Sequence, residues 1–206
     1  MAGERTKKML DRIQMLLGLT DQVKIPPTTI LGFMDDAQSE IAETTLSVES
    51  SASLTVAASA TTEPTGFYRM KLIALASGTL IQPEEISVND YDAMTRYTFS
   101  PPASVGMYFK RWNGTITFYP TLSAGTYTCY FYKTPSTNCS TSVDPETPAR
   151  FDPSVEYYSI YHLAPFVGKL DLVSLYKGLY DASLKDAIQS QRRTKPGIYQ
   201  IAFHDV

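Results

Sequence analysis

The chain has 206 residues, a length that suits one well-packed domain or a domain with a large insertion. Its hydrophobic fraction of 43% and charged fraction of 19% are typical of a globular protein, and a formal net charge of −3 argues against a chain that is cationic throughout and binds nucleic acid. Two cysteines give no disulfide framework, and no apolar run approaches the roughly 18 residues of a membrane span. The first 19 residues lack the continuous apolar core of a signal peptide, so we expect synthesis in the cytoplasm.

Residues 1–44 are expected to form N-terminal helices. The first carries apolar residues at helical spacing, and Gly18 is suited to end it. The second follows Pro26 and Pro27, because proline is tolerated in a first helical turn. The apolar face of this second helix comprises Ile30, Phe33, Met34, Ala37 and Ile41. Its acidic residues, which lie towards the other side, are Asp35, Asp36, Glu40 and Glu43.

Residues 45–140 are expected to form a β-rich insertion. The stretch from Thr45 to Gly66 alternates small polar and apolar residues, the period of a half-buried strand, although its serine and threonine content also suits a disordered linker. Further strands are expected at Phe67–Leu75, Arg96–Phe99, Val105–Trp112, Thr115–Tyr119 and Thr126–Lys133. Asn113-Gly114 is a strong hairpin signal, since both residues tolerate positive φ. Cys129 falls on the same strand face as Tyr127 and Phe131 and is interpreted as a small buried hydrophobe.

Residues 141–193 are expected to form a proline-rich loop and a C-terminal helical hairpin. Asp152 can cap the first helix, near 154–167, with Pro153 in its first turn. Pro165 and Gly168 interrupt the pattern, and Asp171 can cap a second helix near 171–192. Residues 194–206 then form an extended tail. The pattern predicts an α+β protein: a small helical bundle, an inserted antiparallel β-sheet or sandwich, and a C-terminal docking tail.

The sequence offers no catalytic or cofactor-binding motif. It has no phosphate-binding loop, no dinucleotide-binding glycine pattern, no HExxH and no CxxC. His162 lies in a predicted helix and is interpreted as a structural residue, and His204 is close to the chain's last residue. Asp35 and Asp36 are adjacent on a helix and diverge by about 100°, so they cannot share one acid–base site. We therefore expect a protein that is not an enzyme and that has no metal or cofactor.

Aromatic residues gather in the β-rich segment and allow three interpretations: core, protein interface and ligand platform. They are Tyr108, Phe109, Trp112, Phe118, Tyr119, Tyr127, Tyr130, Phe131 and Tyr132. Strands favour aromatics and bury many of them, and tyrosine also suits protein interfaces. An exposed set could stack on sugars, which leaves a carbohydrate-binding module as an alternative function.

The charge is unevenly distributed along the chain. Residues 35–92 contain ten acidic and two basic residues, a net of −8, and such a stretch repels DNA. A late basic cluster comprises Arg192, Arg193 and Lys195. One interpretation is that these positive charges stabilise the negative end of a helix dipole. The other is that they contact an acidic partner surface or a nucleic-acid backbone.

The order of these parts resembles the head-to-tail adaptor proteins of tailed bacteriophages. The resemblance lies in the helices "EYYSIYHLA" and "DLVSLYKGLYDASLKDA", in the hairpin "RWNGTITFYP" and in the strand "TYTCYFYKTP". It extends from about Lys24 to Gln191, and residues 1–19 are less typical of the pattern.

The resemblance implies a structural protein of the virion neck, assembled in the host cytoplasm as a homo-oligomeric ring, commonly of twelve copies. Such a ring lies between the portal protein and a tail or nozzle protein and extends a channel through which DNA passes without sequence-specific binding. No membrane is involved. A tail-completion protein or another virion protein is a further alternative.

Two sets of residues then acquire expected roles. The tail, with the late basic cluster and the residues Ile198, Tyr199, Ile201 and Phe203, is expected to dock on a partner, either the portal protein or a neighbouring subunit. Residues Tyr199, Ile201 and Phe203 would point to one side of an extended strand. A fold back onto the chain's own bundle is the other interpretation. Asp35, Asp36, Glu40 and Glu43 either face a DNA channel or form a solvated outer surface.

Overall fold

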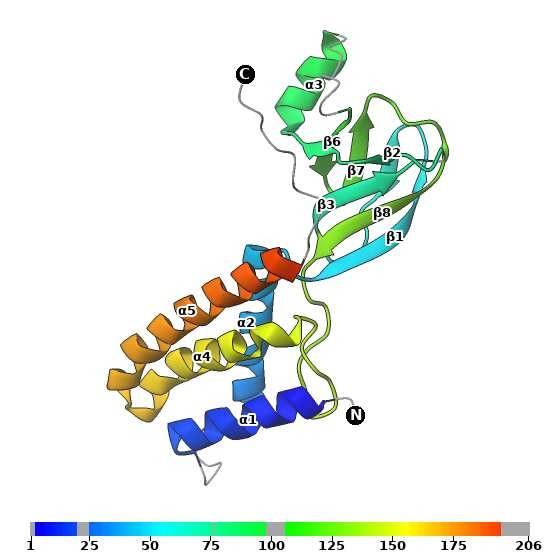
Figure 1. Cartoon of the computed structure of the whole chain (residues 1–206). Coiled ribbons are helices and arrows are strands. Elements are labelled where there is room, and N and C mark those ends of the chain that lie inside the picture. Colours follow the sequence, from blue (N-terminus) through cyan, green and yellow to red (C-terminus); the bar gives the residue numbers. More distant parts are fainter. Residues whose placement is uncertain (1–2, 20–24, 76, 98–105, 195–206) are drawn as a thin grey trace. The chain divides into compact units, whose positions relative to one another are not determined.

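The computed structural model of the chain describes residues 3–19, 25–75, 77–97 and 106–194 (Figure 1). Contacts divide the chain into two compact units. A helical unit comprises Met1–Ser47 and Pro135–Val206, and a β unit comprises Val48–Thr134. The α+β class predicted from the sequence is confirmed.

The helical unit contains four α-helices and two short 3₁₀ segments in its described part. They are α1 (Glu4–Leu17), α2 (Pro27–Thr45), η1 (Ala149–Phe151), α4 (Asp152–Leu163), η2 (Ala164–Val167) and α5 (Leu170–Thr194). Helix α4 contacts α1, α2 and α5, and it is buried on most sides. Its position explains why "SVEYYSIYHL" lacks a clear polar face.

Two glycines end helical segments as the sequence predicts. Gly18 has φ 67° and donates its N–H to carbonyl oxygens in the last turn of α1. Gly168 has φ 75° and closes η2 in the same manner, after Pro165. The proposed caps differ from the prediction. Asp152 is the first residue of α4 rather than its cap, and Asp171 lies within the first turn of α5, which begins at Leu170.

The core of the helical unit combines one face of each helix. Residues with exposed fractions of 2% or less include Met9, Ile13, Leu17, Ile30, Met34, Ile41, Phe151, Val155, Ile160 and Leu163. The apolar residues predicted for the first two helices therefore pack against α4. Burial of this size is the main source of the unit's stability.

In its described residues, the β unit contains two sheets and one helix. The strands are β1 (Glu49–Val56), β2 (Ala60–Thr62), β3 (Phe67–Ala74), β4 (Leu80–Ile81), β5 (Glu84–Glu85), β6 (Tyr108–Trp112), β7 (Thr115–Tyr119) and β8 (Gly125–Lys133). One sheet has the order β1-β8-β3-β4 and the other β2-β7-β6-β5. The pairs are antiparallel except for β5 and β6, which run parallel.

Alternation along the strands places one face of each sheet in a shared core. Tyr127, Cys129 and Phe131 of β8 are buried, whereas Thr128 and Tyr130 between them are exposed. Cys129 has an exposed fraction of 0%, which confirms its interpretation as a small buried hydrophobe. Asn113 and Gly114 have φ values of 48° and 70° and join β6 to β7, as predicted for the hairpin.

The strand predicted at Arg96–Phe99 is wrong at Arg96, because that residue ends helix α3 (Val88–Arg96). The side chain of Ser87 accepts from the N–H of Asp90 at 3.1 Å and starts this helix. Tyr91 on its inner face donates to the carbonyl oxygen of Phe118 at 3.2 Å, which ties α3 to the second sheet. The stretch Thr45–Gly66 contains β1 and β2 rather than a disordered linker, and its first residue, Thr45, ends α2.

Candidate functional site

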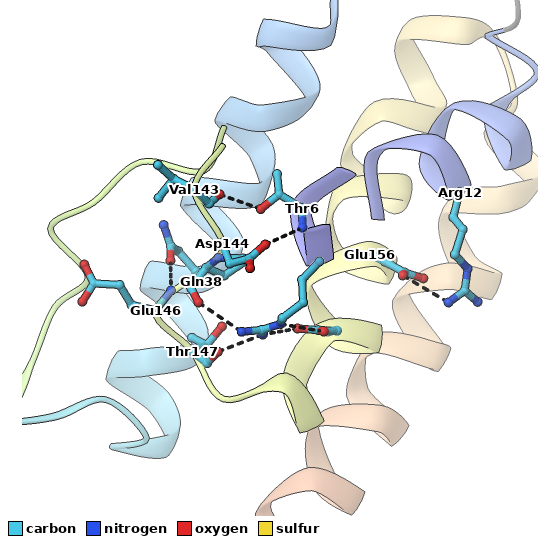
Figure 2. Close-up of polar contacts among 11 residues, drawn as sticks. Thr6, Arg12, Gln38, Val143, Asp144, Glu146, Thr147 and Glu156 are labelled. Atoms are coloured by element: carbon cyan, nitrogen blue, oxygen red, sulfur yellow. Dashed lines mark hydrogen bonds and ion pairs between the residues drawn. The ribbon is translucent and has the colours of Figure 1, made fainter. Parts of the chain in front are cut away.

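A polar network joins α1 to the loop before α4 (Figure 2). Arg5 forms an ion pair with Asp152 and donates to the carbonyl oxygens of Pro145 at 3.3 Å and Thr147 at 3.0 Å. One guanidinium therefore satisfies a helix N-terminal carboxylate and two loop carbonyls. The adjacent Asp152 carboxylate in turn raises the pKa of Arg5.

Thr6 continues this network one residue later in α1. Its hydroxyl donates to the carbonyl oxygen of Val143 at 2.7 Å, and its backbone N–H donates to Asp144 at 3.0 Å (Figure 2). Thr6 is fully buried despite its polar side chain. The N–H groups in the first turn of a helix have no intrahelical partner, so Asp144 acts as the missing acceptor.

The same loop is fastened to α2 by Gln38 and Asp35. The Gln38 side chain is buried and donates to the carbonyl oxygen of Thr137 at 3.0 Å, and it accepts from the N–H of Glu146 at 3.1 Å. Asp35 accepts from the N–H of Cys139 at 2.6 Å. Asp35, a predicted channel-facing residue, is half-buried and holds the loop between Thr134 and Ala149.

A buried carboxylate faces α1 from the middle of the bundle. Glu156 of α4 accepts from Arg12 of α1 at 3.2 Å, and burial raises its pKa to about 7. Sequence reasoning missed this residue. The available signal was a glutamate in a helix whose other positions are apolar or small on nearly every side.

Aromatic rings from α2, α4 and α5 form a cluster within the helical unit. The ring centroids of Tyr158 and His162 lie 4.4 Å apart, and Phe33 stacks on His162 at 5.9 Å. Tyr180 donates its hydroxyl to Glu40 at 2.9 Å. Burial lowers the pKa of His162, and the Nε2 atom has no hydrogen-bond partner among the described residues. His162 is packed within the bundle, as interpreted from the sequence.

The remaining predicted acidic residues share one exposed face of α2. Asp36, Glu40 and Glu43 are exposed, and their spacing places them within about 60° of one another around the helix axis. Asp35 points about 100° away from Asp36 and is engaged with the loop. The structure therefore brings three of the four residues together on one surface.

The aromatic residues of the β unit do not form a single exposed platform. Tyr108, Phe109, Phe118, Tyr127 and Phe131 are buried. Trp112 is 69% exposed and Tyr130 is 41% exposed, but they belong to strands of different sheets. The core interpretation holds for the majority of the set.

One cavity of the β unit presents carboxylates without a basic residue beside them among the described residues. The cavity between α3 and the second sheet has a volume of about 470 Å³ and is lined by Glu84, Asp90, Met94, Tyr97 and Tyr108, among others. Its described lining has no basic residue to complement the two carboxylates. In the described part of the chain, histidines, cysteines and carboxylates nowhere gather in threes as metal ligands.

The predicted docking residues lie at or beyond the limit of the described structure. The backbone of Arg192 and Arg193 continues α5, and their side chains are not described. Lys195, Ile198, Tyr199, Ile201 and Phe203 lie outside the described residues. Their docking role stays a prediction.

Comparison with known proteins gives one family match. A family model described as "SU10 adaptor protein" matches residues 6–200, nearly the whole chain. No curated protein matches the sequence significantly. None of the described helices combines the length and the apolar character needed to cross a bilayer.

Proposed function

The chain belongs to the SU10 adaptor protein family, a family of phage head–tail adaptors, and on that premise we propose that it forms a homo-oligomeric ring of twelve copies between the portal protein and the tail. The ring extends the DNA channel and offers a docking surface to a tail or nozzle protein. Its place is the neck of the virion.

The observation that carries the channel part of this proposal is the exposed carboxylate face of α2. Asp36, Glu40 and Glu43 present negative charge on one side of a helix whose other side is held by the bundle core. Phosphates repelled by this face pass without adhering, which suits a conduit.

A second observation supports contact between copies. Leu175 and Leu179 lie four residues apart on α5 and are 54% and 37% exposed. Leu170 near the start of the same helix is 70% exposed. Exposed leucines on a helix of an isolated subunit are typical of surfaces that become buried on assembly.

Native mass spectrometry of the chain, alone and after mixing with its phage's portal protein, tests the ring. The expected result is a closed oligomer, either alone or bound to the portal protein with fixed stoichiometry. A chain that stays monomeric in both samples contradicts the proposal. If that monomer is retained on a glycan array, the carbohydrate-binding alternative gains support.

The channel role is tested in virions that carry Asp36→Lys and Glu43→Lys together, with Glu40 retained because it accepts the hydrogen bond of the buried Tyr180. We expect normal assembly and slower DNA ejection, because cations would hold the phosphate backbone. The matched control is Asp181→Lys with Asp186→Lys, which changes exposed carboxylates of α5. Equal ejection rates in both variants would place the α2 face outside the channel.

A further inference from the structure

The strand β1 borders its sheet, and only one of its edges pairs with a described strand, β8 (Figure 1). The N–H of Lys133 donates to the carbonyl oxygen of Val48 at 2.9 Å, and the antiparallel register continues from Glu49 opposite Tyr132. In such a ladder, alternate residues turn both backbone groups away from the partner strand. Ser51, Ser53 and Thr55 therefore present their N–H and C=O groups at the outer edge.

These outward groups are unoccupied in the described part of the chain. No hydrogen bond from a described residue reaches the outward backbone groups of Ser51, Ser53 or Thr55. All three residues are exposed. The sequence of β1, "ESSASLTV", also lacks the lysine and proline that commonly protect an edge strand.

The opposite border of the same sheet is covered. Strand β4 pairs with Ile73 and Ala74 of β3, and Arg111 donates to the carbonyl oxygens of Phe67 and Tyr68 at 3.4 and 3.1 Å. The guanidinium of Arg111 is itself held by Glu63. One border is thus closed by side chains and a short strand. The β1 border is open at Ser51 and Ser53 and is joined to β2 directly after Val56, where Ala57 and Ala60 exchange backbone hydrogen bonds.

A groove runs beside the open edge. It has a volume of about 260 Å³ and lies between β1 and β2, with Leu54, Thr55, Thr61 and Pro64 in its lining. A peptide in this groove has β1 on one side and Thr61, Thr62 and Pro64 on the other. This is the arrangement used in recognition by strand addition.

The alternation of core-facing and solvent-facing side chains in β1 determines which peptide sequence can add to its edge. In β1, Leu54 and Val56 face the core, whereas Ser51, Ser53 and Thr55 face solvent. An added strand continues both faces, so it needs apolar side chains at alternate positions and polar or small ones between them.

The last residues of the chain have this pattern. Tyr199, Ile201 and Phe203 alternate with Gln200, Ala202 and His204. The segment follows Lys195-Pro196-Gly197, where proline and glycine oppose continuation of α5. An extended segment of this length matches the span from Ser51 to Thr55.

We propose that residues 198–204 of one copy add as a β-strand to the outer edge of β1 in a second copy. The proposal rests on the homo-oligomeric ring of the proposed function. Donor and acceptor occupy different parts of each copy, so the contact is heterologous and repeats from copy to copy, as closure of a ring requires. Tyr199, Ile201 and Phe203 enter the groove beside Leu54, and Gln200 and Ala202 continue the solvent face.

The test is disulfide trapping between two full-length variants. One chain carries Ser53→Cys, and the other carries Gln200→Cys, Ala202→Cys or Ile201→Cys. Cysteines on separate chains make every linked dimer intermolecular. Because cross-strand neighbours on one face lie about 4.5–5.5 Å apart at Cβ, we expect linkage at Gln200 or Ala202 and at least tenfold less at Ile201. Equal yields at all three positions overturn the proposal.

A proline variant tests the backbone contact. Ser51→Pro, added to the Ser53→Cys chain, removes an outward N–H without touching the ladder to β8, since proline is tolerated where the N–H faces away from the sheet. We expect the yield to fall at least tenfold, and Ser51→Ala is the matched control. Circular dichroism melting checks that both variants remain folded. Unchanged linkage with Ser51→Pro contradicts strand addition at this edge.

Native mass spectrometry of the same mixtures distinguishes failure of the strand-addition proposal from failure of the ring proposal. A closed ring without linkage at Gln200 or Ala202 overturns the strand-addition inference and leaves the ring intact. If the chain stays monomeric in every mixture, including those with portal protein, both the ring and the strand addition are contradicted.

Discussion

Arg12 of α1 lies 3.2 Å from Glu156 of α4, measured from Nη1 to Oε1, and the two side chains differ sharply in exposure. The arginine side chain is 60% exposed, whereas the glutamate side chain is 4% exposed. Burial costs the carboxylate more than this single ion pair returns, so its pKa rises to about 7. The contact between α1 and α4 is therefore sensitive to pH.

Replacement of the buried carboxylate is expected to flatten the dependence of stability on pH. The folded pKa of Glu156 is raised above the unfolded value, so its contribution is fully favourable below the unfolded pKa of about 4.5 and is lost as pH rises through about 7. Glu156→Gln removes this loss and should gain on the order of 2 kcal/mol over wild type above pH 7. Urea unfolding at pH 4.5, 6 and 8 measures it.

The control for this experiment is Glu4→Gln, which changes an exposed carboxylate of α1. A wild-type stability that does not decline between pH 4.5 and 8 would show that Glu156 does not carry the expected cost.

Removal of the Arg5 guanidinium is expected to destabilise the helical unit. Arg5→Met leaves Asp152 and the carbonyl oxygens of Pro145 and Thr147 without their donor, which should cost about 2–4 kcal/mol. Arg5→Lys should recover part of the loss, because one ammonium cannot reach every acceptor that the guanidinium serves. Equilibrium denaturation compares the variants, and a Met variant as stable as wild type would exclude an anchoring role.

The hydroxyl of Tyr180 is expected to contribute a modest amount to stability. It donates to Glu40 at 2.9 Å, and the ring is 5% exposed, so Tyr180→Phe should lose about 1 kcal/mol. Tyr176→Phe on the same helix is the matched control, since Tyr176 makes ring contact with Tyr157 and its hydroxyl forms no hydrogen bond with a described residue. Melting curves that do not separate the two variants would contradict the prediction.

Both native thiols are expected to resist modification in the folded protein. Burial raises the pKa of Cys129 to about 12 and also raises that of Cys139, so neither forms a thiolate at pH 8. Ellman's reagent should label neither thiol without denaturant and both in urea. Ser53→Cys, an exposed position, should react at once and serves as the positive control. Rapid native labelling of the wild type would contradict the burial of these side chains.

The helices and the central hairpin could be predicted because local signals and tertiary packing agree. Ile30, Met34 and Ile41 recur at helical spacing, and Asn113-Gly114 supplies the positive φ values of a tight turn. Helix α3 was not predicted, because "VNDYDAMTR" is short and mostly polar and depends on the Ser87 cap and the contact of Tyr91 with the second sheet.

The roles of individual acidic residues depended on long-range contacts and could not be predicted. Asp35 and Asp36 are equivalent in sequence, yet one accepts from Cys139, more than a hundred residues away, and the other is exposed. Periodicity places a side chain on a helix face but does not identify the loop that returns to that face. Glu156 was missed for the same reason, since its partner Arg12 precedes the β unit.

The hydrogen bond between Val48 and Lys133 lies where the chain enters and leaves the β unit, so the two crossing points are adjacent in space. A segment whose two ends are adjacent can be replaced by another domain, because a short linker is enough to rejoin the flanking chain. Genetic recombination at these two points would let the helical unit keep its own partners while a different module takes the place of the β unit. The arrangement thus allows one part of the gene product to be replaced while the other is kept.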